Sequence, residues 1–289
     1  MLIRAATRGS PLARWQAEHV AALLRAVDPV VEVELVIVDT QADQRLDVPI
    51  HELGGKGVFA KEVQTAVLDR RADIAVHSAK DLPSVTVPGL ALAAVPERAD
   101  PRDALVGSRL ADLPDGAEIA TGSLRRRAEL WRHRPDLRMV ELRGNMQTRL
   151  AKAAAHDAIV VAAAALDRLG LGHQITERLP VQVMVPQVGQ AALGVECREE
   201  DAERRAVLAR IEHHPTRRCV DAERAFLVEL GGDCSLPAGA HAVIDGDDLT
   251  VTAFLGRPDA RATERATATG PGADVGTAVA VDLRDRLGV

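Results

Sequence analysis

Short apolar runs alternate with stretches of helical periodicity along the first two thirds of the chain. A strand is predicted where a short run is β-branched or continuously apolar, and a helix where apolar residues recur every three or four positions. The predicted strands cover residues 2–6, 31–38, 72–76, 139–142 and 158–164, with a further strand end at 119–121. The predicted helices cover residues 59–68, 124–131 and 145–155, and another begins at Ser10. This alternation predicts open α/β sheets that bind ligands beyond their strand ends.

The first helix has a clear start in the sequence. Ser10 is a favourable N-cap residue, and Pro11 suits the first helical position because its missing N–H would have no partner there. The residues expected to face the core are Leu12, Trp15, Ala22 and Leu23. This helix therefore follows the first strand after a short polar turn.

The last part of the chain follows another pattern. Residues 216–230 predict a helix, residues 240–244 and 249–255 predict strands, and a final helix ends the chain. Residues 183–196, which Pro and Gly interrupt, predict a crossover back to the first domain. We therefore predict two α/β domains and a small C-terminal α+β domain. Their expected boundaries are residues 1–97 with 190–212, residues 98–189, and residues 213–289.

Bulk composition narrows the class of protein. Of the 289 residues, 47% are hydrophobic and 27% are charged, which is typical of a soluble globular protein. The formal net charge of -6 argues against a general polyanion binder, and an aromatic content of 2% leaves few rings for stacking single-stranded nucleic acid. No apolar run reaches the ~20 residues that span a bilayer, and three cysteines do not suggest a disulfide framework. We expect a cytoplasmic protein without a nucleic-acid or membrane partner.

Arginines recur where a predicted strand feeds a helix. The residues at these junctions are Arg8, Arg125, Arg126, Arg143, Arg149 and Arg168. Strand ends of one sheet converge on one crevice, and a guanidinium binds a carboxylate through two parallel hydrogen bonds. Each arginine alone could be a solvated surface charge, but the repeated placement favours a shared cleft. The sequence therefore predicts a site for a ligand with several carboxylates or phosphates.

Residues 74–83 form the most distinctive run in the chain. An apolar strand leads into a turn that contains Ser78, Lys80 and Asp81 and that Pro83 helps to fix. A carboxylate at the edge of a cleft can act as a general acid or base, or stabilise a developing cation. A simple turn role for Asp81 stays open, and we expect His77 to be a buried, hydrogen-bonded imidazole.

Cys234 lies in a glycine-rich loop and is a candidate nucleophile or covalent anchor, because a thiol on such a loop is accessible. Cys197 and Cys219 are interpreted as structural.

His213 and His214 are adjacent and cannot share a helix face, so no metal site is predicted. Residues 54–57 lack the spacing of a nucleotide-binding loop, and their glycines fit a lid better.

Seven segments together resemble the porphobilinogen deaminase family, and they occur in the order found in that family. They are residues 6–13, 54–59, 72–83, 121–127, 142–150, 186–190 and 231–234. The resemblance implies a three-domain fold whose first two domains are similar to type II periplasmic binding proteins. It also implies a monomeric transferase that joins four porphobilinogen molecules head to tail and releases hydroxymethylbilane, in tetrapyrrole and heme biosynthesis. The implied cofactor is dipyrromethane, made from substrate and held by a thioether to Cys234.

The resemblance also implies roles for individual residues. Asp81 would protonate the leaving amine and stabilise the positive azafulvene that remains. The implied cofactor ligands are Cys234, Lys80, Asp81, Ser123, Arg125, Arg126 and Gly144. The implied substrate ligands are Arg8, Ser10, Arg143, Arg149, Arg168, Lys56 and Phe59. The chain departs from the family pattern at Gln41, Glu52 and Gly122.

Two other functions compete with this interpretation. A non-catalytic receptor for small anions could use the same bilobal scaffold, but it would have no use for Cys234. An arginine-rich RNA-binding module would show salt-sensitive affinity for polynucleotides, and the acidic total charge disfavours it.

Overall fold

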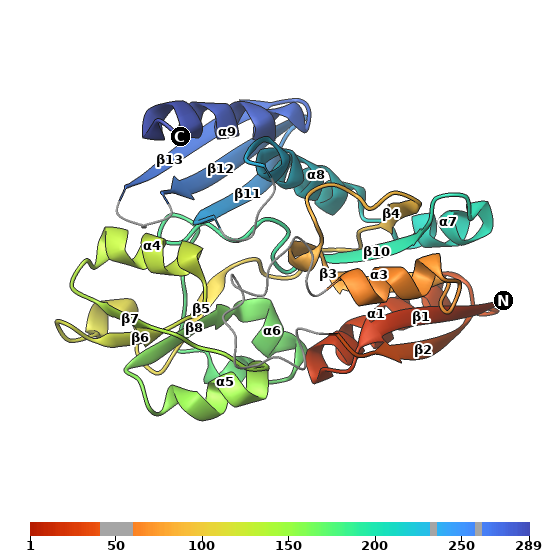
Figure 1. The fold of residues 1–289 in the computed structure, drawn as a ribbon, viewed down its shortest axis with the longest axis horizontal. Helices are drawn as coiled ribbons and strands as arrows, with labels where there is room; N and C mark the ends of the chain where they lie inside the picture. Colours follow the sequence, from red (N-terminus) through yellow and green to blue (C-terminus); the bar gives the residue numbers. More distant parts are fainter. Residues whose placement is uncertain (41–59, 232–235, 258–261) are drawn as a thin grey trace.

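Three sheets organise the molecule (Figure 1). The computed structural model describes residues 1–40, 60–231, 236–257 and 262–289. Two of the sheets have five strands each, in the orders β2-β1-β3-β10-β4 and β7-β6-β8-β5-β9, and the third has the order β11-β12-β13. In Figure 1 the three-stranded sheet lies above the second sheet, and the first sheet lies to the right.

The first sheet combines the N-terminal strands with one strand from much later in the chain. Its strands are β1 (Leu2–Arg8), β2 (Glu32–Val38), β3 (Ile74–Ser78), β4 (Leu90–Ala94) and β10 (Leu193–Arg198). Strand β1 runs parallel to β2 and β3, whereas β10 runs antiparallel to β3 and β4. Helix α1 (Pro11–Val27) covers one face and α3 (Lys61–Leu68) the other. Helix α7 (Ala202–Leu208) follows β10.

The second sheet is built from the middle of the chain. Its strands are β5 (Asp103–Val106), β6 (Glu118–Ala120), β7 (Arg138–Val140), β8 (Ala158–Ala162) and β9 (Glu177–Arg178). Strand β6 runs parallel to β7 and β8, and β5 runs antiparallel to its neighbours β8 and β9. The helices that follow its parallel strands are α4 (Leu124–His133), α5 (Met146–Ala153) and α6 (Ala163–Arg168).

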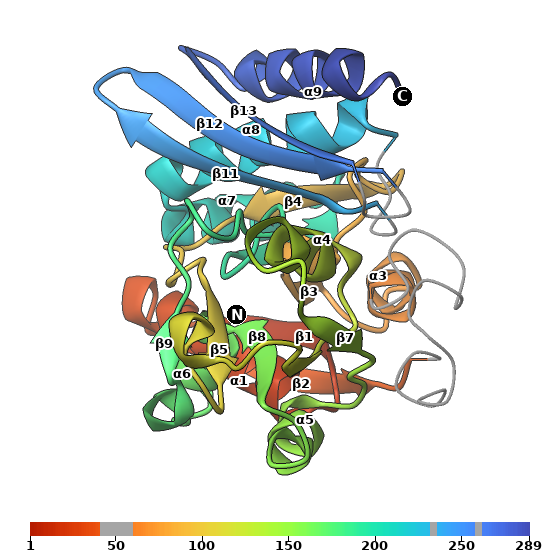
Figure 2. The same ribbon diagram turned by 90° about the vertical axis from the view of Figure 1, so that its left-hand side faces the viewer.

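The third sheet is a meander with two helices packed on it. Strands β11 (Ala238–Asp245), β12 (Asp248–Gly256) and β13 (Thr263–Gly270) pair antiparallel in sequence order. Helices α8 (His214–Glu229) and α9 (Asp274–Leu287) contact each other and this sheet, as Figure 2 shows for α9. Their shared core surrounds Phe226 and otherwise consists of small and aliphatic side chains.

These sheets confirm the predicted class of two α/β layers and a small α+β unit. The predicted helix start is also confirmed, since the Ser10 hydroxyl accepts from the backbone N–H of Ala13. The inward face of α1 was predicted wrongly in part, because Ala22 is exposed and the buried stripe lies around Ala17 and Val20. The apolar run 158–164 is a strand only as far as Ala162, after which α6 begins. Strands β4, β5, β9, β10 and β13 were not predicted.

A helix that crosses a bilayer needs about 20 mainly apolar residues. None of the helices in residues 1–40, 60–231, 236–257 and 262–289 is long and apolar enough to cross a membrane.

Candidate functional site

The predicted site residues follow parallel strands of the first two sheets. Strand β3 runs directly into a short 3-10 helix, Ala79–Asp81, which carries Lys80 and Asp81. Strands β6 and β7 likewise lead to the start of α4 and to Arg143. Because the carboxyl ends of parallel strands lie at one edge of a sheet, each sheet presents its candidate residues at such an edge.

Asp81 lies within electrostatic range of cations from both sheets. Burial lowers the pKa of Lys80 to about 8, and the Asp81 carboxylate counteracts that shift. Burial likewise lowers the pKa of Arg149 to about 10. Arg126 and Arg143 add to the second shift, whereas Asp81 opposes it. The five side chains that share this region are Lys80, Asp81, Arg126, Arg143 and Arg149. Its guanidinium groups repel one another, and a bound polyanion would reduce that repulsion.

A buried aspartate that the sequence analysis missed holds two of the arginines. The Asp103 carboxylate accepts hydrogen bonds from Nη2 of Arg125 at 2.8 Å and from Nε and Nη2 of Arg126 at 3.0 and 2.7 Å. Burial raises the pKa of Asp103, but the two arginines outweigh this effect and lower it to about 2. No sequence motif marks Asp103, since its partners come from other segments.

Gln190 connects this aspartate to the turn that carries Asp81. Its Nε2 donates to Asp103 Oδ1 at 3.0 Å, and its Oε1 accepts from Lys80 Nζ at 3.3 Å. A second amide, Gln187 Nε2, donates to the Lys80 carbonyl at 3.4 Å. The residues between the second sheet and β10 thus join the two sheets at the candidate site.

Arg125 and Arg126 are largely enclosed by protein. Their relative exposures are 4% and 6%, and each also donates to a main-chain carbonyl, Val185 for Arg125 and Val160 for Arg126. Ion pairs with Asp103 hold both guanidinium groups in place. The cofactor-binding role expected of both arginines remains a prediction.

Two serines expected at the site cap helices. Ser10 Oγ accepts from the N–H of Ala13 at 3.3 Å, and Ser123 Oγ accepts from the N–H of Arg126 at 3.4 Å. Both serines therefore sit beside the positive end of a helix dipole, next to a strand end.

The remaining predicted residues lie in several places. Arg8 is the last residue of β1, and the carbonyl of Gly144 accepts from Arg149 Nε at 2.8 Å. The Nη2 of Arg168 donates to the Ala191 carbonyl at 2.6 Å, and its guanidinium lies 5.5 Å from the ring centre of Trp15. Lys56, Phe59 and Cys234 lie outside the described residues.

Gly122 is the one departure from the family pattern that the structure describes. A Cβ atom at this position would lie 2.7 Å from Oε1 of Glu141 and 3.0 Å from the Leu142 carbonyl. Glu141 is ion-paired with Arg127, so a serine at position 122 would require that pair to move. Gln41 and Glu52 fall in the part of the chain that is not described.

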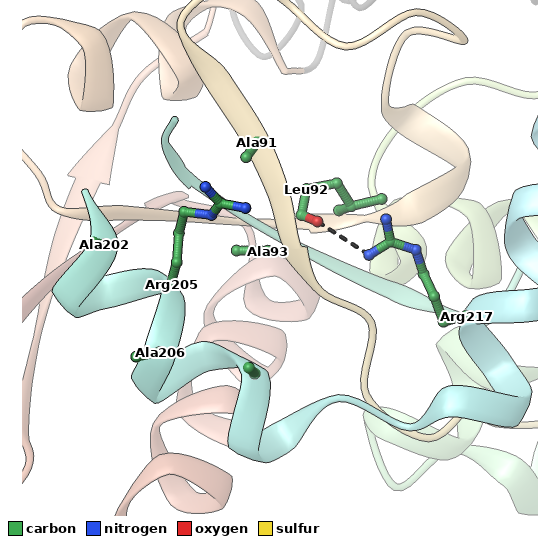
Figure 3. Close-up of a pocket in the computed structure, with 8 residues that line it drawn as sticks. Ala91, Leu92, Ala93, Ala202, Arg205, Ala206 and Arg217 are labelled. Atoms are coloured by element: carbon green, nitrogen blue, oxygen red, sulfur yellow. Dashed lines mark hydrogen bonds between the residues drawn. The ribbon is translucent and has the colours of Figure 1, made fainter. Parts of the chain in front are cut away.

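A cavity of about 480 Å³ lies elsewhere, between β4 and α7 (Figure 3). Alanines line much of it, together with Leu92, Arg205 and Arg217. Arg217 donates to the Leu92 carbonyl at 3.0 Å and is ion-paired with Asp221, so its charge is already neutralised. None of the predicted site residues that the structure describes lines this cavity. Across the described ranges, the His, Cys, Asp and Glu side chains form no group of three or more that could hold a metal ion.

Comparison with known structures finds proteins of low sequence identity. The methionine-binding protein MetQ is 13% identical, covering 73% of this chain and 89% of its own, with a TM-score of 0.46. A nutrient-binding protein from Burkholderia cenocepacia bound to methionine is 14% identical, covering 73% and 90%, with a TM-score of 0.42. The LysR family transcriptional regulator CbnR is 17% identical, covering 75% and 69%, with a TM-score of 0.43.

Comparison with family models covers nearly the whole chain. Residues 3–206 match the model described as porphobilinogen deaminase, dipyromethane cofactor binding domain. Residues 217–285 match the model described as porphobilinogen deaminase, C-terminal domain. The first match spans both five-stranded sheets and the turn that carries Asp81, and the second spans the three-stranded sheet. The chain therefore belongs to the porphobilinogen deaminase, or hydroxymethylbilane synthase, family of enzymes.

Proposed function

We propose that this chain joins four porphobilinogen molecules head to tail, with loss of ammonia, and releases hydroxymethylbilane. One observation carries the proposal: the Asp81 carboxylate lies within electrostatic range of cations from two sheets, among them Lys80 and Arg149. A pyrrole with acetate and propionate arms needs that excess of positive charge, and a proton transfer at its aminomethyl group needs the acid.

The residues present fit a dipyrromethane cofactor. Its carboxylates would meet a donor that can still form a hydrogen bond, because Nε of Arg125 is buried without a hydrogen-bond partner among the described residues. The side chains and backbone that would hold it are Cys234, Lys80, Asp81, Ser123, Arg125, Arg126 and Gly144. When bound through a thioether to Cys234, the dipyrromethane supplies the pyrrole carbon onto which the first substrate is joined.

Asp81 would handle the proton and the positive charge of each coupling. As an acid it would donate to the departing amine nitrogen, and as a carboxylate it would stabilise the cation that ammonia leaves behind. The short helix that carries Asp81 is held by Gln187 and Gln190 through Lys80, which limits the movement of the carboxyl group.

The arginines would bind and orient the substrate arms. Guanidinium groups bind carboxylates with two parallel hydrogen bonds, so they fix the direction of each pyrrole as well as its position. The proposed substrate ligands are Arg8, Ser10, Arg143, Arg149, Arg168, Lys56 and Phe59.

We also propose that the chain works as a cytoplasmic monomer of three domains, with no nucleic-acid or membrane partner. The proposed boundaries are residues 1–97 with 190–212, residues 98–189, and residues 213–289. The pairing of β10 with β3 and β4 supports the return of the chain to the first domain. The net charge of -6 disfavours a polynucleotide partner.

Intact-protein mass spectrometry tests the cofactor and its anchor. The wild type should carry the extra mass of two linked pyrrole units, and Cys234→Ser should lack it. Cys219→Ser is the matched control, because Cys219 packs against the core of α8 and should leave the extra mass in place. An unmodified mass for freshly prepared wild type that converts porphobilinogen would refute the covalent cofactor.

A further inference from the structure

A buried polar group lies behind the turn that carries Asp81. The Glu196 carboxylate, on β10, is 3% exposed and accepts a hydrogen bond from Gln64 Nε2 at 2.8 Å. The same carboxylate oxygen lies 3.2 Å from Nε2 of His77, whose side chain is 4% exposed. Three elements meet there: helix α3, strand β3 and strand β10.

The arrangement follows from the strand pattern. Ala75 packs with Val63 and Ala66 of α3 on one face of the first sheet. Since side chains alternate along a strand, His77 points to the same face and meets the same helix. Strand β10 runs antiparallel beside β3 and brings Glu196 to this position.

A polar group is a costly way to fill such a space. A buried carboxylate loses its hydration, and well-packed apolar residues of similar volume are often equally stable or more stable. Three aliphatic side chains would therefore serve stability as well as Gln64, His77 and Glu196 do. What they would not provide is a polar contact to His77, one residue before the turn begins at Ser78. His77 is buried as expected, but its Nε2 lies 3.2 Å from the Glu196 carboxylate without forming a hydrogen bond.

The far end of the same turn is held from α8. Arg224 donates to the Ser84 carbonyl at 2.9 Å. Residues 78–84 therefore lie between the contact of Glu196 with His77 on one side and the hydrogen bond from Arg224 on the other.

We propose that Glu196 is a positioning residue for the reaction, a role that rests on the proposed function of Asp81. It acts on the first end of residues 78–84 through its contact with His77, and Gln64 holds its carboxylate in place. Lys80 and Asp81 lie between those ends, so a small shift of either end displaces the acid from the reacting nitrogen.

The test compares Glu196→Gln with a matched variant at the other end of β3. Asp73→Asn removes a buried carboxylate that is ion-paired with Arg4 at 3.0 Å and lies just before β3 begins. Both variants should lower the melting temperature. Glu196→Gln should also lower kcat by about tenfold or more with KM changed by less than about threefold, whereas Asp73→Asn should retain the wild-type kcat. A wild-type kcat for Glu196→Gln would overturn the proposal.

A double variant separates positioning from general loosening. If Glu196 acts through the turn, Glu196→Gln should change the residual kcat of Asp81→Asn by less than about twofold. The full tenfold loss in that background would show an independent effect and overturn the proposal. Should Glu196→Gln fail to fold, Gln64→Met gives the same comparison. Failure of the wild type to release ammonia from porphobilinogen would instead refute the proposed function itself.

Discussion

Asp103 shows how one side chain can organise two arginines. Its carboxylate is fully buried between Arg125 and Arg126, and Gln190 supplies a further hydrogen bond. A buried carboxylate with two guanidinium partners leaves a net positive charge, which suits a site for carboxylated ligands. Neither guanidinium could remain buried in this position without that counter-ion.

Asp103→Asn should lower the free energy of unfolding by about 3–5 kcal/mol, because two buried cations lose their counter-ion. Denaturant titration measures this, with exposed Asp112→Asn as a control expected to change it by less than about 0.5 kcal/mol. A loss for Asp103→Asn as small as the control's would contradict this role.

The stabilisation by Asp103 should also depend on pH. Because the pKa falls from 3.8 to about 2 on folding, the stabilisation is complete above pH 3.8 and is lost as the pH falls through about 2. The difference between wild type and Asp103→Asn should therefore shrink in acid. An unchanged difference across that range would contradict the assignment.

At the scale of helices and strands, local signals predicted most elements. Ser10 and Pro11 mark the start of α1, a short apolar run marks β1 and a β-branched run marks β2, because these signals reside in consecutive residues. Strand β13 carries Thr, Ala and charged residues without an apolar run, and β5 has only four residues, so neither gave a periodic signal. The burial of small residues on α1 also left its inward face ambiguous.

The candidate site was predictable only where its residues follow a strand. Lys80 and Asp81 could be placed in this way, as could the arginines at the starts of helices. Asp103 and Gln190 could not, because their roles come from contacts between segments far apart in the chain. The stacking of Arg168 on Trp15 is likewise a tertiary contact between α6 and α1, which periodicity does not show.

Helices α8 and α9 approach closely at Gly276. A Cβ atom there would lie 1.9 Å from the carbonyl oxygen of Ala222 and 2.9 Å from the backbone nitrogen of Phe226. Both are backbone atoms of α8, so neither can rotate away. The packing of the third sheet's two helices therefore depends on this glycine.

Gly276→Ala should lower the free energy of unfolding by about 1–3 kcal/mol, because the steric conflict outweighs the ~1 kcal/mol that alanine adds in helix propensity. Thermal unfolding followed by circular dichroism measures the effect. Ala278→Gly, at an exposed position two residues further along α9, measures the propensity alone. A Gly276→Ala variant more stable than wild type would contradict the close approach.

At the scale of the whole molecule, Glu223 links the third sheet to the segments that connect the other two. Its carboxylate, on α8, is ion-paired with Arg98 at 2.6 Å and accepts from the N–H groups of Gly189 and Ala242 at 2.8 and 3.0 Å. Burial raises the pKa of Glu223, but Arg98 and His241 outweigh it and lower the pKa to about 2. Arg98 precedes the second sheet, Gly189 follows it, and Ala242 belongs to the third sheet. All three thus meet at the Glu223 carboxylate.

Glu223→Gln should lower the free energy of unfolding by about 3–5 kcal/mol, because Arg98 would stay buried without its partner. The third sheet should also unfold separately from the rest, which urea titration would record as two transitions. Glu229→Gln is the control on the same helix, since its pair with Arg284 is partly exposed and should contribute less than about 1 kcal/mol. A single wild-type transition for Glu223→Gln would contradict the link.

The central proposal is that Asp81 acts on substrates joined to a covalent primer. The most direct measurement is the intact mass of wild type and Asp81→Asn after brief exposure to limiting porphobilinogen. Wild type should gain mass in steps of one pyrrole unit, and Asp81→Asn should keep the cofactor mass yet add units at least ~100-fold more slowly. Stepwise growth of Asp81→Asn at the wild-type rate, or no growth of wild type, would contradict the account.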